Sequence, residues 1–357
     1  MTNTDPSQAR RLVFLLVLGL TAAVFSGCAQ VSSVAPVTEA KPAPEGDCHR
    51  AESQRFVFHS DPWINLHHFL FEWARNVPER PPGDRGRAVD VTERTQLGSL
   101  EEGDRRVWEQ ALGFYRERLV SRDLLFDRDL IVLRGQLASI ACSGGNPDII
   151  DNTELRTVLT EAMPVYRKHW WPAHHAASMA WIRERLADLE SYEATLSERL
   201  AQAYGGEWPA DRIRADITAY AKWSGAYTTN QPDHVTISAL GYQGLEGLEI
   251  LFHEVSHASF FEQRLLGHLA AAFRQRGAEL PDRLSHVIQF ATPPELLRSV
   301  LPGEKAGNDR SVAERVHERG SAIHLYRTVL EHWKPFLDGK IERSEALDRI
   351  AAALALQ

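Results

Sequence analysis

Apolar residues recur every three or four positions along most of the chain, which is the spacing of one face of an amphipathic helix. Gly205 and Gly206 follow a long charged segment of this kind, as expected where a helix ends. The pattern predicts helices over Trp63–Arg75, Leu100–Val120, Leu124–Ala141, Asn152–Met163, Pro172–Tyr204, Leu245–Arg276, Asp282–Ala291, Pro294–Val300, Ser311–Trp333 and Arg343–Leu354.

A different pattern fills the segment between the long charged helix and the helix that begins near Leu245. Polar and apolar residues alternate in part over Arg212–Ala221, Gly225–Thr229 and His234–Ser238, which is typical of half-buried strands. The residues of Asn230–Asp233 are those that turns prefer. The sequence therefore predicts a mainly α (α+β) protein, with a small mixed sheet beside the helix that follows it.

The first residues have the pattern of a bacterial secretory signal. Arg10 and Arg11 precede a short apolar run that ends in small residues. The sequence Phe25-Ser26-Gly27-Cys28 resembles the bacterial lipobox, in which the cysteine is acylated, palmitate being one such acyl group, and becomes the first residue of the mature chain. The resemblance implies a signal peptide over 1–27 and a lipoprotein anchored to a membrane through Cys28. Ala29 at the next position implies the outer membrane, facing the periplasm.

The chain after the anchor divides by composition. Residues 28–47 are rich in Ala, Pro, Ser and Val, which predicts a flexible tether. A helical N-terminal region is expected over 48–205 and a metallohydrolase region over 206–357, the two forming one unit. Besides Cys28 the chain has two cysteines, Cys48 and Cys142. In an exported protein such a pair predicts one disulfide; two separate buried thiols are the alternative.

Composition and charge exclude some functions. Apolar residues make up 43% of the chain, charged residues 25%, and the formal net charge is −8. These values are ordinary for a globular protein. A nucleic-acid partner is not expected, because such proteins normally present a basic face. The oligomeric state is left open by these observations.

His253, Glu254 and His257 form the pattern with the clearest chemistry. Residues four positions apart on a helix lie on one face, so two imidazoles can share one metal ion. Zinc lowers the pKa of a bound water towards neutrality, and Glu254 can take the proton of that water as general base. The sequence therefore predicts a zinc hydrolase. The alternative is a surface helix with incidental histidines.

This pattern resembles the HExxH signature of the zincin metallopeptidases. The resemblance covers roughly residues 212–300, and the wider chain is similar to bacterial envelope proteins that carry the same motif. It implies a zincin-like core, bound zinc, and a peptide or protein substrate in the cell envelope. In that superfamily substrate lies along the edge strand that precedes the motif helix. His234–Ser238 occupies that position in the sequence, so we expect it to bind substrate by strand addition.

The third metal ligand is harder to identify. His268 lies eleven residues beyond His257, too far for the metzincin pattern. A gluzincin-like site takes a glutamate from a later helix. We favour Glu295, because Pro293 and Pro294 allow a sharp redirection of the chain that aims a carboxylate at the metal. His286, in an apolar helical setting, is the main alternative. The other glutamates considered are Glu262, Glu279, Glu304 and Glu314.

Hydrolysis of an amide also needs a donor for the developing oxyanion. We favour Tyr242, because it lies between the last predicted strand and the motif helix. The other candidates are Tyr227, His324, Tyr326 and Arg298. Two further functions stay open: a zinc-stabilised envelope protein that binds or scaffolds without catalysis, and a hydrolase of a non-peptide amide or ester.

Overall fold

The computed structural model describes residues 48–75, 88–140, 146–222, 224–230, 232–301, 311–317 and 323–355. The signal peptide over 1–27, the tether over 28–47 and Cys28 lie outside the described residues, and so does Cys142. Lipid anchoring and the disulfide between Cys48 and Cys142 therefore stay predictions.

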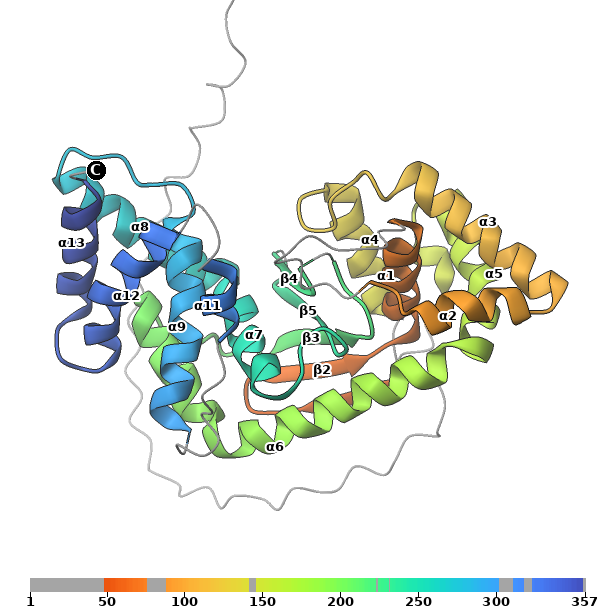
Figure 1. Ribbon diagram of the computed structural model, residues 1–357, viewed down its shortest axis with the longest axis horizontal. Coiled ribbons are helices and arrows are strands. Elements are labelled where there is room, and N and C mark those ends of the chain that lie inside the picture. Colours follow the sequence, from red (N-terminus) through yellow and green to blue (C-terminus); the bar gives the residue numbers. More distant parts are fainter. Residues whose placement is uncertain are drawn as a thin grey trace, which may run out of the picture. The chain divides into compact units, whose positions relative to one another are not determined.

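The centre of the fold is a five-stranded mixed sheet with the strand order β1-β2-β3-β5-β4 (Figure 1). Strands β2, β3 and β5 run parallel, and β1 and β4 are antiparallel to their neighbours at the two edges. The strands are β1 (His49–Glu52), β2 (Phe56–Ser60), β3 (Ile213–Thr218), β4 (Ala226–Thr229) and β5 (His234–Ser238). The regions 48–205 and 206–357 therefore contribute strands to one sheet.

Helices make up most of the rest of the fold. They are α1 (Pro62–Arg75), α2 (Val91–Gln96), α3 (Glu102–Arg118), α4 (Arg128–Ile140), α5 (Thr153–His169), α6 (Trp171–Tyr204), α7 (Gly244–Ser256), α8 (Ser259–Gln275), α9 (Leu284–Val300), α11 (Val312–His317), α12 (Ile323–Leu337) and α13 (Arg343–Leu354), with short 3-10 helices over Leu97–Ser99 and Pro147–Ile149. Across the described parts of the chain, no helix combines the length and apolar character that a membrane crossing needs.

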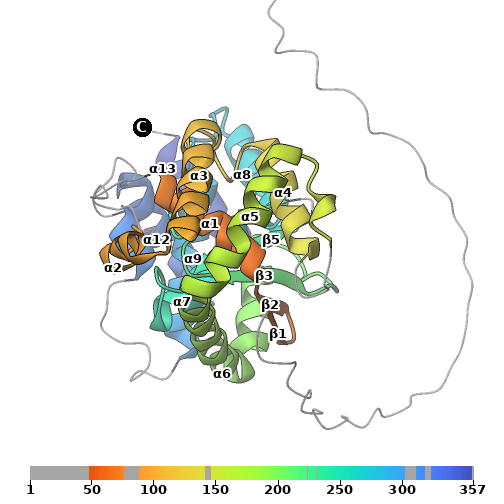
Figure 2. The same cartoon turned by 90° about the vertical axis from the view of Figure 1, so that its right-hand side faces the viewer.

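The alternation of residues along the strands decides which helices cover which face. Apolar residues of β3 and β5, such as Ile217 and Ile237, belong to a core shared with α6, α7, α9, α12 and α13. The helices α1, α3, α4 and α5 pack with one another into a second core, which also contains Tyr227 of β4. Figure 2 shows α3, α4 and α5 gathered around α1. The long helix α6 contacts both helical groups and the sheet.

The second face of the sheet is polar but buried beneath α1 and α4. The guanidinium of Arg134 on α4 donates hydrogen bonds to the Thr236 hydroxyl (3.0 Å) and the His234 carbonyl (2.8 Å), and also contacts the Thr229 hydroxyl. The imidazole of His68 on α1 bonds to the Tyr227 hydroxyl at 2.8 Å. Edge strand β4 is therefore fixed from this face by two helices of the N-terminal region.

The predicted fold class, mainly helical with a small mixed sheet, is confirmed. Strands β1 and β2 were not predicted from the sequence. The helix expected over Leu245–Arg276 is divided into α7 and α8 at His257 and Ala258, where the Ser259 amide bonds to the Asp233 carboxylate at 3.0 Å. The two helices expected over Asp282–Val300 form one continuous helix, α9, which contains both prolines.

The expected position of the edge strand is corrected. His234–Ser238 is β5, and it pairs with β3 on one side and β4 on the other. Its backbone hydrogen bonds are therefore used within the sheet, and no edge is left for strand addition. Among the described residues, the edge without a strand partner on this side belongs to β4, which precedes β5 in the chain and pairs with it antiparallel.

Candidate metal centre

Helix α7 carries the motif on one side and packs against the core on the other. Leu248, Leu251 and Val255 are fully buried in the core and give the helix its apolar face. The helix ends at Ser256, and His257 caps it, with its amide bonded to the Glu254 carbonyl at 3.1 Å. His253 and His257 therefore lie on the same side at the very end of the helix.

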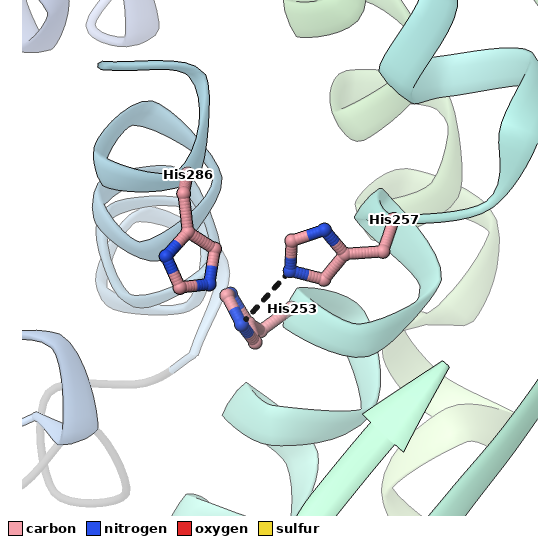
Figure 3. A group of neighbouring side chains, drawn as sticks. All are labelled: His253, His257 and His286. Carbon is pink, nitrogen blue, oxygen red and sulfur yellow. Dashed lines mark hydrogen bonds between the residues drawn. The ribbon is translucent and has the colours of Figure 1, made fainter. Parts of the chain in front are cut away.

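Helix α9 brings a third histidine to this pair. The side chains of His253, His257 and His286 each offer a ring nitrogen, and these nitrogens lie within 4.8 Å of one another. Figure 3 shows the three rings directed towards one another, His253 from α7, His257 from its C-terminal cap and His286 from α9. No other group of three such potential ligands occurs among the described residues.

The donor set fits a zinc ion. Tetrahedral zinc with Zn–N distances of about 2.0–2.1 Å places its ligand nitrogens roughly 3.4 Å apart. The Nε2 atoms of His253 and His257 lie 3.3 Å apart, close to that separation. Without a metal ion, one of these two nitrogens can donate a hydrogen bond to the other; a cation between them can accept the lone pairs of both.

The three imidazoles are held neutral, which is the form that binds metal. Burial lowers the pKa of His257 to about 3, with the neighbouring His286 as a second cause. Burial also lowers the pKa of His286 to about 4, helped by His317 and Arg283. For His253, burial and the two other imidazoles move the pKa well below its usual value.

The surroundings of His253 fix its orientation. Its Nδ1 lies 3.3 Å from the backbone carbonyl of Gln289 on α9 and donates a hydrogen bond to it, which leaves Nε2 free to face the other imidazoles. The Phe290 ring stacks on the His253 ring with 3.7 Å between centroids. The Gln289 side-chain amide donates to the Ser256 carbonyl at 2.8 Å, so the same stretch of α9 is also fastened to the end of α7.

Glu254 is the one buried carboxylate next to the two α7 histidines along the chain. The Thr228 hydroxyl on β4 contacts it twice, at 2.9 Å to a carboxylate oxygen and at 2.7 Å to the backbone carbonyl. Burial raises the pKa of Glu254 to about 7, against the opposing effects of Thr228, Lys222 and Arg134. The carboxyl group can therefore gain or lose a proton near neutral pH.

The structure does not place Glu295 among the imidazoles. Its carboxylate is paired with Arg298 and lies 3.0 Å from the Lys334 ammonium of α12. The prediction of Glu295 as ligand assumed that the prolines redirect the chain. Because α9 is continuous, Glu295 follows His286 by nine residues, which is about two and a half helical turns. The Glu295 side chain therefore points about 180° away from that of His286. With His286 facing α7, Glu295 faces α12.

Tyr242 is engaged elsewhere in the fold. Its hydroxyl donates to the Ser224 carbonyl at 2.7 Å, and its own carbonyl accepts a hydrogen bond from the Trp181 indole at 2.8 Å. Both bonds secure the chain between β5 and α7. Among the other oxyanion candidates, Tyr227 bonds to His68, Arg298 pairs with Glu295 and Glu314, and His324 is exposed.

His317, at the end of α11, was not singled out from the sequence. Its ring stacks on Tyr326 (5.1 Å between centroids) and meets the edge of Phe290 at 5.2 Å. Its Nε2 is buried and has no hydrogen-bond partner among the described residues. A lone histidine in a charged helical segment carries no local signal of such a position, which arises only when α11 packs against α7 and α9.

Comparison of the chain with protein-family models, with curated proteins and with solved structures finds no match.

The lowered pKa values make the metal-free protein sensitive to acid. Below pH 6.5 the unfolded chain protonates His286, whereas the folded chain does so only near pH 4, so the unfolded state binds more protons. The unfolding free energy should therefore fall as the pH drops through this window. Urea titrations in EDTA should show this, and His286→Gln should reduce the slope by up to about 1.4 kcal/mol per pH unit. An unchanged slope in the variant would contradict the burial of a neutral imidazole.

Proposed function

We propose that this protein is a zinc-dependent hydrolase, in which His253, His257 and His286 hold the ion and Glu254 is the general base. The observation that carries the proposal is the convergence of three neutral imidazoles, with the buried carboxylate of Glu254 next to His253 in the chain. Polar ring nitrogens directed at one another at the end of a buried helix cost free energy unless a shared partner satisfies them. The arrangement is therefore difficult to explain as packing alone.

When bound, zinc supplies a Lewis acid that lowers the pKa of a coordinated water towards neutrality. Glu254 takes a proton from the attacking water and later delivers it to the leaving nitrogen or oxygen. A pKa of about 7 suits both directions of this transfer. The Thr228 hydroxyl keeps one carboxylate oxygen fixed by donating to it, which leaves the other to receive the proton.

A peptide is the substrate class that the surroundings of Glu254 favour. Thr228 belongs to β4, whose outer edge is free of strand partners among the described residues. An extended peptide added to this edge would pass beside Glu254, with main-chain hydrogen bonds supplying affinity independent of sequence. In this proposal β4, rather than His234–Ser238, binds the substrate by strand addition. The likeness of the motif to zincin metallopeptidases agrees with a peptidase.

His317 is the group that we assign to the developing oxyanion, in place of Tyr242. Its buried Nε2 has no hydrogen-bond partner in the part of the chain that the structure describes, and its ring is held between Tyr326 and Phe290, which itself stacks on His253. A neutral imidazole in this place can donate an N–H to a substrate oxygen beside the imidazole cluster.

The lipobox-like sequence that ends in Cys28 supports a place for this activity in the bacterial cell envelope. A lipid on Cys28, followed by the segment 28–47, would tether the hydrolase to the outer membrane, facing the periplasm. Its substrates would then be peptides or proteins of the envelope.

Replacing Glu254 by glutamine tests the reaction. We expect E254Q to keep zinc and to lose activity by at least about a thousandfold, because the amide cannot take a proton. Purified protein from residue 48 onwards would be assayed for zinc content and for cleavage of a peptide library, with and without a chelator. Glu262→Gln, a half-buried carboxylate on the next helix, serves as the control and should cleave normally.

Two results would contradict this assignment. Full turnover by E254Q would remove Glu254 as the base. Stoichiometric zinc without chelator-sensitive cleavage of peptides, amides or esters by the wild-type protein would favour a non-catalytic, zinc-stabilised envelope protein instead.

Two substitutions distinguish His286 from Glu295 as the third metal ligand. His286→Ala should lower zinc content well below one ion per chain, because it removes one of three nitrogen donors. Glu295→Gln removes only a charge paired with Arg298 and Lys334, and zinc should stay stoichiometric. Zinc analysis of both proteins after dialysis gives the answer; loss of zinc from Glu295→Gln alone would restore the glutamate as ligand.

Replacing His317 by phenylalanine keeps a ring between Tyr326 and Phe290 but removes the N–H. We expect zinc content and KM to change little and kcat to fall by a factor on the order of 100, as for the loss of one oxyanion donor. Steady-state kinetics on a cleaved library peptide would measure both constants. A fall in zinc content with unchanged kcat per bound zinc would assign His317 to the metal shell instead.

A further inference from the structure

Helix α9 contains two consecutive prolines, Pro293 and Pro294, in its interior, both buried. A proline inside a helix is costly, by about 3 kcal/mol, because it removes a backbone donor and crowds the preceding turn. The helix nevertheless continues through both prolines to Val300. We therefore expect a benefit that offsets the cost of the two prolines, and the backbone carbonyls of the preceding turn indicate one.

Each proline leaves one carbonyl of the preceding turn without its helical partner. In an α-helix the N–H of residue i bonds to the carbonyl of residue i−4, so Pro293 cannot bond to Gln289. The next possible donor, at i+5, is Pro294, which also lacks an N–H. The Gln289 carbonyl is therefore denied both its normal donor and the π-type alternative.

The carbonyl freed in this way is the one that contacts His253. The Nδ1 atom of His253 lies 3.3 Å from the Gln289 carbonyl oxygen, and this bond joins α7 to α9. Two neighbouring contacts keep the carbonyl in place: the Gln289 amide bonds to the Ser256 carbonyl at 2.8 Å, and Phe290 stacks on the His253 ring. The Gln289 carbonyl, which lacks its helical donor, therefore accepts the hydrogen bond of the His253 ring.

We propose that Pro293 is a positioning residue of the metal centre, which keeps the Gln289 carbonyl available to the Nδ1–H of His253. The inference rests on the proposed metal site. With Nδ1 carrying the proton, Nε2 holds its lone pair towards His257 and His286. Loss of such a partner of a metal ligand typically weakens metal binding by about 10- to 100-fold.

Pro293→Ala restores a backbone N–H that competes with His253 for the Gln289 carbonyl. We expect the dissociation constant for zinc, measured by competition with a chromogenic chelator, to rise about 10- to 100-fold. Pro294→Ala is the matched control, because the α-helical acceptor of its restored N–H is the Phe290 carbonyl, and only the rare π-type geometry would direct it to Gln289; its dissociation constant should stay within about threefold of wild type. In EDTA both variants should unfold at the same urea concentration as wild type or higher, since alanine favours a helix.

A second measurement reports on the proton directly. Nitrogen NMR of the metal-free, histidine-labelled protein should show Nδ1 of His253 protonated in the wild type and in Pro294→Ala. In Pro293→Ala the proton should move in part to Nε2. This readout requires neither bound zinc nor activity, and assignment comes from comparison with His253→Gln.

The outcomes separate this inference from the function on which it rests. If the wild type binds no zinc at these histidines, the proposed function fails. If the wild type binds zinc and Pro293→Ala binds it equally well, with the proton still on Nδ1, the role of Pro293 is overturned. Equal weakening in both proline variants would also overturn it, because a general loosening of α9 would then be the cause.

Discussion

The contact between α7 and α9 at His253 is the interaction on which the site depends. Within one turn of α9, His286 supplies a ring nitrogen, the Gln289 carbonyl accepts the His253 Nδ1 proton, and Phe290 stacks on the same ring. Residues 286, 289 and 290 share one face of a helix, so a single rotational setting of α9 satisfies all these contacts. Rotating the helix by half a turn would direct the His286 imidazole away from α7 and lose the carbonyl contact.

This dependence explains which residues of the candidate site could be predicted from the sequence. His253, Glu254 and His257 are separated by a fixed helical geometry, so their grouping needs no knowledge of tertiary structure. The third partner depends on how a distant helix is rotated, and the sequence offered both His286 and Glu295. Pro293 and Pro294 suggested a break between two helices. In the fold the same prolines stay within one helix, because packing against α6, α7 and α12 outweighs their local preference.

The sheet shows the same limit. The predicted strands near Ile217 and Ile237 were recognisable from alternation, whereas β1 and β2 are short and pair with segments far along the chain. Which strand lies at the edge is a property of pairing rather than of composition. The strand that precedes the motif helix, β5, lies between β3 and β4, and β4, which comes before it in the chain, takes the edge. Thr228 then joins that edge to Glu254, a link between sheet and helix that the sequence does not reveal.

Two successive turns of helix α7 organise the site. Glu249 lies four residues before His253, and its buried carboxylate accepts the Val312 and Ala313 amides of α11, each at 3.0 Å. Burial raises the pKa of Glu249 to about 7, and these two amide bonds oppose that shift by favouring the charged form. One turn of α7 thus holds the helix that carries His317, and the next turn holds α9 through His253. One face of α7 therefore positions both α9, which carries His286, and α11, which carries His317. Because these positions depend on contacts with α7, the local sequences of α9 and α11 do not reveal them.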